Sequence, residues 1–168
     1  MESALSRRWT GAPVAELYAR HMGDAVRLAR LLIGDDQAED AAHEAFIRAA
    51  GRFAHLRRTQ AFEAYLRTAV VNECRARVRR LRLERAWVAR QERGEAVVAP
   101  TDIETRSEVW DALAALPWRQ RAALVLRYYE DLPVDHIGRN LRCSTRAANA
   151  LLVRGLAGLR HTLMKEER

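Results

Sequence analysis

Residues 131–160 read DLPVDHIGRNLRCSTRAANALLVRGLAGLR, and this stretch decides the fold of the C-terminal part of the chain. Apolar residues recur at spacings of three and four on both sides of a short break, which is typical of two helices joined by a tight turn. Ser144 follows the break, and its hydroxyl can accept a hydrogen bond from a free backbone N–H group in the first turn of a helix. The stretch therefore predicts a helix-turn-helix, whose second helix usually enters the DNA major groove.

The apolar positions of this unit predict its core. Leu132 and Ile137 should pack the first helix of the motif, and Leu141 should anchor the turn. Gly138 has no side chain, so the two helices could cross closely there. The other expected core residues are Leu124, Leu126 and Tyr128 in a helix that begins at Pro117, and Ala148, Leu152 and Leu156 in the second helix of the motif.

Helical periodicity also dominates the rest of the chain. The predicted helices are 13–33, which Gly34 should end, 37–50, 61–93 and 103–115. Residues 52–60 are predicted to form a loop, and no alternation of Val, Ile or aromatic residues indicates a strand. Gly94 and Pro100 interrupt the pattern where acidic residues replace Arg. The fold class is therefore all-α, with two small helical domains, 12–90 and 105–163, joined by a flexible linker at 91–104.

The charge of the chain indicates an anionic partner. Its formal net charge is +7 and its pI is about 10.4, and Lys165 is the only lysine among its many arginines. Guanidinium groups make bidentate contacts with phosphate and guanine, so nucleic acid or an acidic protein surface is the leading partner class. A GC-rich coding sequence would also raise the Arg content, but it does not explain why six arginines surround one predicted helix between 75 and 85.

Several other classes of protein are not indicated. Cys74 and Cys143 lie far apart without a nearby His pair, so no disulfide framework, metal site or cofactor is expected. The stretch AHEAF lacks the second His of a zinc-protease helix, and we expect no enzymatic activity. No apolar run approaches the roughly 18 residues of a membrane span, so we expect a cytoplasmic protein without membrane contact.

Three stretches together resemble one known family. LPWRQRAALVLRYYEDLP, before the helix-turn-helix, resembles region 4 of the extracytoplasmic-function sigma factors of bacterial RNA polymerase, a group of the sigma-70 superfamily. DDQAEDAAHEAFIRAAGRF and FEAYLRTAVVNECRARVRR resemble region 2 of the same family. The resemblance covers about Val14 to Arg160, with the two regions in the family's order.

The resemblance implies an alternative sigma factor, which binds core RNA polymerase, directs it to specific promoters and assists promoter melting. The implied partners are the beta-prime clamp helices and the beta flap of the polymerase, promoter DNA, and an anti-sigma factor as the frequent regulator. The helix AEDAAHEAF would dock on the clamp helices. The residues expected to bind core polymerase are Glu39, Asp40, Glu44 and Arg48.

Region 2 of the family also opens the minus-10 element and holds an unstacked base, which costs a few kcal/mol that the protein must offset. By resemblance, the loop that contains His55 and Leu56 would form the rim of the base pocket. Asn72 would supply a polar contact to the base. Strand phosphates would be held by Arg75, Arg79 and Arg80.

The family match also sets the register of the second helix of the motif on the minus-35 element. The expected DNA-reading residues are Arg146, Asn149, Ala150, Val153 and Arg154. Arg and Asn can read guanine and adenine through paired hydrogen bonds, whereas Ala and Val offer only apolar contact with a thymine methyl. Asn149 stands where relatives often carry Lys or Arg. We therefore expect weaker minus-35 binding than in such relatives.

Two other functions fit parts of the sequence. A stand-alone helix-turn-helix regulator would use its N-terminal half to dimerise or to sense a ligand. An Arg-rich RNA-binding helical protein would show no promoter selectivity. The helix AEDAAHEAF distinguishes these readings, because it is expected only if polymerase is the partner. The acidic linker resembles the family's connection toward the polymerase active site, although a plain tether has the same composition.

Overall fold

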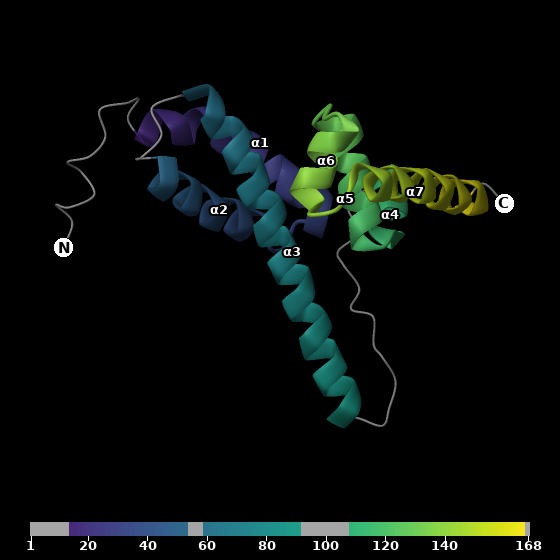
Figure 1. Cartoon of the computed structure of the whole chain (residues 1–168). Helices are drawn as coiled ribbons and strands as arrows, with labels where there is room; N and C mark the ends of the chain where they lie inside the picture. The colour runs from purple at the N-terminus through teal and green to yellow at the C-terminus, as the bar shows by residue number, and fades with distance from the viewer. Residues whose placement is uncertain (1–13, 54–58, 92–107, 167–168) are drawn as a thin grey trace. The chain divides into compact units, whose positions relative to one another are not determined.

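The computed structural model describes residues 14–53, 59–91 and 108–166 (Figure 1). Within these ranges the chain forms seven α-helices and one π-helical turn, and it contains no strand there, so the all-α prediction is confirmed. The chain divides into two compact units, Met1–Cys74 and Arg75–Arg168, and the division falls inside the long helix α3 (Thr59–Gln91). Each unit is described separately below.

The first unit is built on α1 (Val14–Ile33), α2 (Ala38–Phe53) and the first half of α3. Gly34 ends α1 with a φ of 86°, and its N–H donates to the Arg30 carbonyl oxygen at 2.9 Å, as predicted for a C-terminal glycine. The ring of Phe46 meets the rings of Tyr18 and Phe62 edge-on, at centroid distances of 5.2 and 5.7 Å. These aromatic contacts join all three helices.

The second unit contains α4 (Glu108–Ala115), α5 (Trp118–Leu124), the π-helical turn η1 (Val125–Tyr129), α6 (Val134–Leu141) and α7 (Thr145–Glu166). In Figure 1, α7 is the long yellow helix that packs against α4, α5 and α6. The predicted core residues Leu124, Leu126, Leu132, Ile137, Leu141, Ala148 and Leu152 are all buried. Arg121 joins α4 to α5 by donating to the Ala114 carbonyl oxygen at 2.7 Å, and burial lowers its pKa.

Two of the expected core residues are instead exposed. Leu156 is 41% exposed, because α7 packs through Gly155 and Gly158, where a Cβ atom would lie 3.1 Å and 2.7 Å from the side chains of Leu124 and Leu116. Tyr128 is 65% exposed. It lies in η1, where the Glu130 N–H donates to the Val125 carbonyl oxygen, and this wider turn shifts the following side chains out of α-helical register.

The predicted helix limits also need correction around the first loop. α2 continues past Gly51 to Phe53, and α3 begins at Thr59 rather than at Ala61, so the predicted 52–60 loop is shorter at both ends. Gly51 has open space around it and lies inside the helix, where a single Gly costs only about 1 kcal/mol relative to Ala. The described part of the predicted 103–115 helix begins at Glu108.

The turn between α6 and α7 is held by backbone hydrogen bonds. Arg142 has left-handed dihedral angles, with φ 52° and ψ 54°. The Cys143 N–H donates to the Gly138 carbonyl oxygen at 2.9 Å, and the Arg142 N–H donates to the Arg139 carbonyl oxygen at 3.3 Å, which is a Schellman motif. A Cβ on Gly138 would lie 2.8 Å from the Cys143 carbonyl oxygen. Gly138 is therefore required by the turn backbone, not by a crossing of two helices as expected.

Gly138→Ala should destabilise the second unit by about 1 to 3 kcal/mol, the usual cost of overpacking, because the new methyl group meets backbone that cannot rotate away. Urea unfolding of the whole chain, followed by circular dichroism, measures this change. Gly51→Ala is the matched control, since nothing lies within 4 Å of the added Cβ. It should stabilise α2 by about 0.5 to 1 kcal/mol. Equal responses of the two variants would contradict the close approach at Gly138.

Candidate nucleic-acid and polymerase interfaces

The first turn of α7 is fixed by a side-chain cap. The Ala147 N–H donates to the Ser144 Oγ at 3.1 Å, and α7 begins at Thr145, so the predicted cap is confirmed. The cap satisfies one of the backbone N–H groups that a helix leaves free at its start. It thereby holds in place the first turn of α7, which carries Arg146.

The five expected DNA-reading residues lie on one face of α7. Their spacing of three and four residues repeats over two turns, and this face lies opposite the buried residues Ala148, Leu152 and Gly155. All are exposed except Ala150, which is half-buried. Val153 is 67% exposed, which is high for a large apolar side chain. The Arg154 Nε donates to the Ala150 carbonyl oxygen at 3.2 Å, so this guanidinium lies along the helix.

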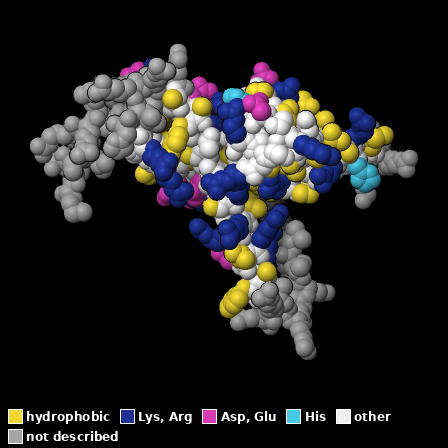
Figure 2. Space-filling view, in the orientation of Figure 1, with side chains coloured by type: hydrophobic (Ala, Val, Ile, Leu, Met, Phe, Trp, Pro, Cys, Tyr) yellow, Lys and Arg dark blue, Asp and Glu magenta, His cyan; other side chains and the backbone are white. Residues whose placement is uncertain are grey.

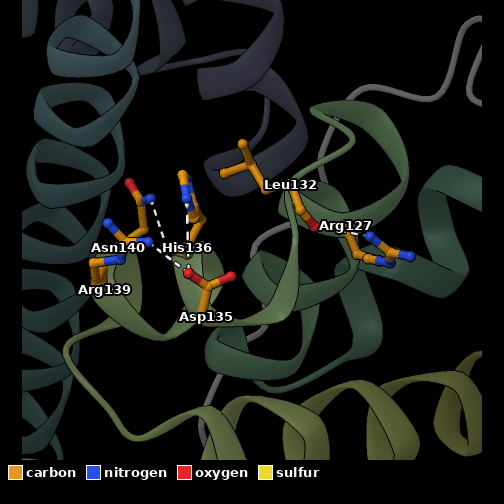
Figure 3. Close-up of polar contacts among 6 residues, drawn as sticks. All are labelled: Arg127, Leu132, Asp135, His136, Arg139 and Asn140. Atoms are coloured by element: carbon orange, nitrogen blue, oxygen red, sulfur yellow. Dashed lines mark hydrogen bonds and ion pairs between the residues drawn. The ribbon is translucent and has the colours of Figure 1, made fainter.

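Polar side-chain contacts stabilise α6, which is the first helix of the motif (Figure 3). Arg139 Nη2 donates to Asp135 Oδ2 at 2.5 Å, and this hydrogen bond holds the pKa of the Asp135 carboxyl below its ordinary value. Asn140 Nδ2 donates to the His136 carbonyl oxygen at 2.9 Å. These contacts each join residues four apart, so they reinforce the helix itself.

Arginines from other elements satisfy the free carbonyl groups around α6. Arg127 Nη1 donates to the Leu132 carbonyl oxygen at 3.0 Å (Figure 3). Arg119 Nη2 donates to the Leu141 carbonyl oxygen at 3.2 Å. The last carbonyl groups of a helix lack partners within it and carry partial negative charge, so the Arg119 guanidinium stabilises the C-terminal end of α6, whereas Arg127 holds the segment that precedes α6. The motif is thus oriented by charged hydrogen bonds as well as by its core.

Arg75 is engaged in the second unit. Its Nη2 donates to the Asn140 carbonyl oxygen at 2.9 Å, and its guanidinium carbon lies 5.7 Å from the centroid of the Trp118 ring, within the range of a cation–π contact. Burial lowers the pKa of Arg75, and the neighbouring charges of Arg142 and Arg119 lower it further. Its role at a strand phosphate stays a prediction, and it would require the guanidinium to leave these contacts.

The other expected minus-10 residues are only partly brought together. His55 and Leu56 lie outside the described residues. Asn72 is half-buried, whereas Arg79 and Arg80 are exposed on the later turns of α3. Asn72 and Arg79 are seven residues apart and therefore share one face of α3. Figure 2 shows Arg side chains in dark blue along this helix.

The four expected polymerase-binding residues of α2 differ in their contacts. Asp40 and Glu44 are exposed one turn apart, and within the described part of the chain neither makes an ion pair. Glu39 accepts from Arg30 at 3.3 Å. Arg48 forms an ion pair with Glu73 at 2.7 Å. Asp40 and Glu44 are thus the carboxylates of this helix that are most available to a partner.

The sequence did not point to Ile47, although it belongs to the same surface. Ile47 is 65% exposed, and its spacing from Asp40 and Glu44 puts all three side chains on one face of α2. Ile47 lies about one turn after Glu44, and a large apolar side chain that is exposed in the free protein can be an anchor residue of a protein interface. The periodicity of α2 contained this signal, because Ile47 lies off the stripe of buried residues that includes Phe46 and Ala49.

Within the described ranges, no group of three or more His, Cys, Asp or Glu residues could hold a metal ion. Among the described helices, none combines the length and the apolar character that a membrane span needs.

A capped helix with an exposed face follows a tight turn in the second unit, which defines a helix-turn-helix protein, and the first unit presents an exposed acidic face on α2. The sigma-70 region 2 family matches residues 17–84, and the sigma-70 region 4 family matches residues 106–159. The chain belongs to the sigma-70 family as a sigma factor of the extracytoplasmic-function type. It is an alternative sigma factor, which directs RNA polymerase in transcription initiation.

Two curated relatives are RNA polymerase sigma-E factors from Streptomyces. The one from Streptomyces coelicolor is 29% identical over 154 residues, which cover 90% of this chain and 87% of the relative. The one from Streptomyces avermitilis is 30% identical over 150 residues, which cover 88% of this chain and 84% of the relative. Both alignments include the two regions, so the resemblance inferred from three short stretches extends over most of the chain.

A solved structure supports the fold. The sigma factor RpoE from Bartonella quintana, crystallised with the anti-sigma factor NepR, matches with a TM-score of 0.69 and 18% identity. The match covers 89% of this chain and 96% of that one. At this level of identity it supports the helical architecture alone.

Proposed function

We propose that the chain docks on core polymerase through α2, opens the minus-10 element with α3 and reads the minus-35 element with α7. The observation that carries this proposal is the pair of regions in sigma-70 order, each with an exposed face of the required charge. The division of roles assigns each interface to a different helix. Each interface can therefore be tested by substitutions that leave the others intact.

The docking face on α2 consists of Asp40, Glu44 and Ile47. The two carboxylates have no ion-pair partner in the described part of the chain, so a basic surface gains two charge pairs without breaking existing ones. Ile47 adds an apolar contact one turn after Glu44. The basic surface is proposed to be that of the beta-prime clamp helices.

The minus-10 surface lies on α3. Asn72 would contact the unstacked base, and the exposed Arg79 and Arg80 would attract the strand phosphates. Their charge alone gives no sequence selectivity, because phosphate contacts carry none directly. Selectivity at this element is therefore assigned to Asn72 and to the loop that contains His55 and Leu56.

The minus-35 surface is the exposed face of α7. Arg146 and Asn149 are proposed to read base edges, and Val153 to contact a thymine methyl. Only Arg146 and Arg154 bring charge to this face, and Arg154 already donates to its own helix. We therefore expect this face to bind an isolated DNA duplex only weakly.

The proposals on regulation and location rest on the family. The Bartonella relative was crystallised with an anti-sigma factor, and we include such a factor among the proposed partners of this chain. The beta flap of the polymerase is proposed as the second docking surface on core polymerase. The chain is proposed to act in the cytoplasm, to need no cofactor and to catalyse no reaction itself.

The function is tested by reconstitution. The purified chain, mixed with core polymerase, should be retained in a pull-down through a tag on the polymerase. The mixture should also give run-off transcripts from a promoter upstream of the chain's own coding sequence or of another candidate target. Core polymerase alone is the control. A chain that binds promoter DNA but not core polymerase would be a stand-alone regulator.

Asp40→Arg and Glu44→Arg should each reduce core association at least about 100-fold, because a buried like-charge pairing costs several kcal/mol. Fluorescence anisotropy of a labelled chain measures the affinity, and circular dichroism checks the helix content. Asp111→Arg is the matched control, since Asp111 is also an exposed acid but lies on α4. Normal core binding by both α2 variants would show that this face does not dock.

Asn149→Lys should tighten binding to a minus-35 duplex and steepen the dependence of log affinity on log salt by about one unit, as one added phosphate contact does. The salt titration is performed with the holoenzyme and with the free chain. Ala157→Lys adds the same charge to an exposed position two turns further along α7 and should have a smaller effect. Equal effects, or none at Asn149, would place the reading face elsewhere.

A further inference from the structure

Glu73 is the one buried charged residue among the described side chains of the chain. It lies on α3 and is 5% exposed, next to Asn72. Its Oε2 lies 2.7 Å from Nη1 of Arg48, which reaches it from α2 and whose side chain is 61% exposed. The ion pair therefore joins the helix that carries the docking face to the turn of α3 that carries the expected base contact.

A gain in folding stability does not by itself explain a buried ion pair of this kind. Removing a carboxylate from water is costly, and the attraction of its partner often only offsets that cost. A well-packed apolar pair of similar volume commonly gives the same stability or more. The best-attested advantage of a buried ionic group is that it fixes one register between two packed elements.

The packing surface of α2 explains why a register device is useful here. Its buried side chains are alanines except for Phe46: Ala38, Ala41, Ala42, Ala45 and Ala49. Alanines give shallow ridges, so interdigitation opposes sliding or rotation of a neighbouring helix only weakly. Phe46 meets Phe62 near the start of α3, eleven residues before Glu73. The ion pair adds a second contact further along the same two helices.

We propose that the Arg48–Glu73 pair is a positioning link, which sets α3 relative to the docking helix so that bound polymerase holds Asn72 in place for promoter opening. This inference rests on the proposed division of roles between α2 and α3. It assigns Arg48 to Glu73 rather than to the polymerase surface. Arg48 lies one turn after Glu44, so docking of α2 on polymerase also fixes the position of Arg48.

The decisive variant is the double substitution Arg48→Met with Glu73→Leu, which replaces the ionic pair by an apolar pair of similar size. The positioning role predicts that this variant keeps its melting temperature and its core affinity. The rate of promoter opening, measured by permanganate reactivity of unpaired thymines in saturated holoenzyme, should fall at least about fivefold, because small misplacements of reacting groups are costly. A purely structural pair predicts normal opening.

Three further variants keep the test decisive. Arg48→Lys retains the charge and should open the promoter at an intermediate rate. Glu73→Gln keeps the side-chain shape and should show the opening defect even if the double variant fails to fold. Arg20→Met removes the same charge from the exposed Arg20–Glu16 pair of α1 and should behave as the wild type.

Two results would overturn the link. One is a normal opening rate in Glu73→Gln and in the double variant. The other is a loss of core affinity in Arg48→Met with normal opening at saturation, which would return Arg48 to the polymerase surface. The promoter is one that the wild-type holoenzyme transcribes. If the wild-type holoenzyme transcribes no promoter, the proposed function is refuted. If it does transcribe one and the variants open that promoter at the wild-type rate, only the link is refuted.

Discussion

Close approach of helices through small residues is the constraint on which both units depend. In the first unit, α2 buries an alanine stripe against its neighbours. In the second, α7 meets α5 at Gly155 and Leu116, the residue after α4, at Gly158, and α6 meets the turn backbone at Gly138. Added Cβ atoms at these glycines would lie 2.7 to 3.1 Å from neighbouring atoms, so the interior has no room for larger residues. Some large side chains of α2 and α7, such as Ile47 and Val153, can then face outward.

This packing explains how short helices offer functional surfaces. A helix that buries Ala and Gly on one side needs few large apolar residues for its core, and its opposite side can carry Asp40, Glu44 and Ile47, or Arg146 and Val153. The disadvantage is that Ala and Gly side chains interdigitate only weakly, so they do little to fix the position of one helix along another. Directional contacts offset that weakness: the Ser144 cap, the Schellman bonds of the turn and the arginine bonds to the carbonyl end of α6. Polar contacts thus orient what apolar contacts hold together.

The same constraint separates what the sequence predicts from what it does not. Ser144, Gly34, Ile137 and Leu141 were predictable, because caps and core positions depend on local pattern. The prediction that Leu156 is buried was wrong. α7 is apolar on two sides, and the larger side chain was expected in the core, whereas the close contact with neighbouring helices required glycine. The prediction that Tyr128 belongs to the core was wrong, because a π-helical turn changes the helical register without a local sequence signal. The Arg48–Glu73 pair joins residues 25 positions apart, and no periodicity along one helix indicates it.

The reading face of α7 has a consequence for affinity. The proposed face carries two arginines, one of which donates to its own helix, so it would gain little from phosphate contacts, and the DNA bases would be read mainly by Asn149, Arg146 and an apolar strip. A weak module becomes effective when a second interaction holds it near its site, because the effective concentration replaces intrinsic affinity. The docking face of α2 can supply that second interaction, since it uses a different helix and the opposite charge. The predicted weak minus-35 binding would then restrict promoter recognition to the holoenzyme, because the free chain lacks the polymerase that raises its local concentration.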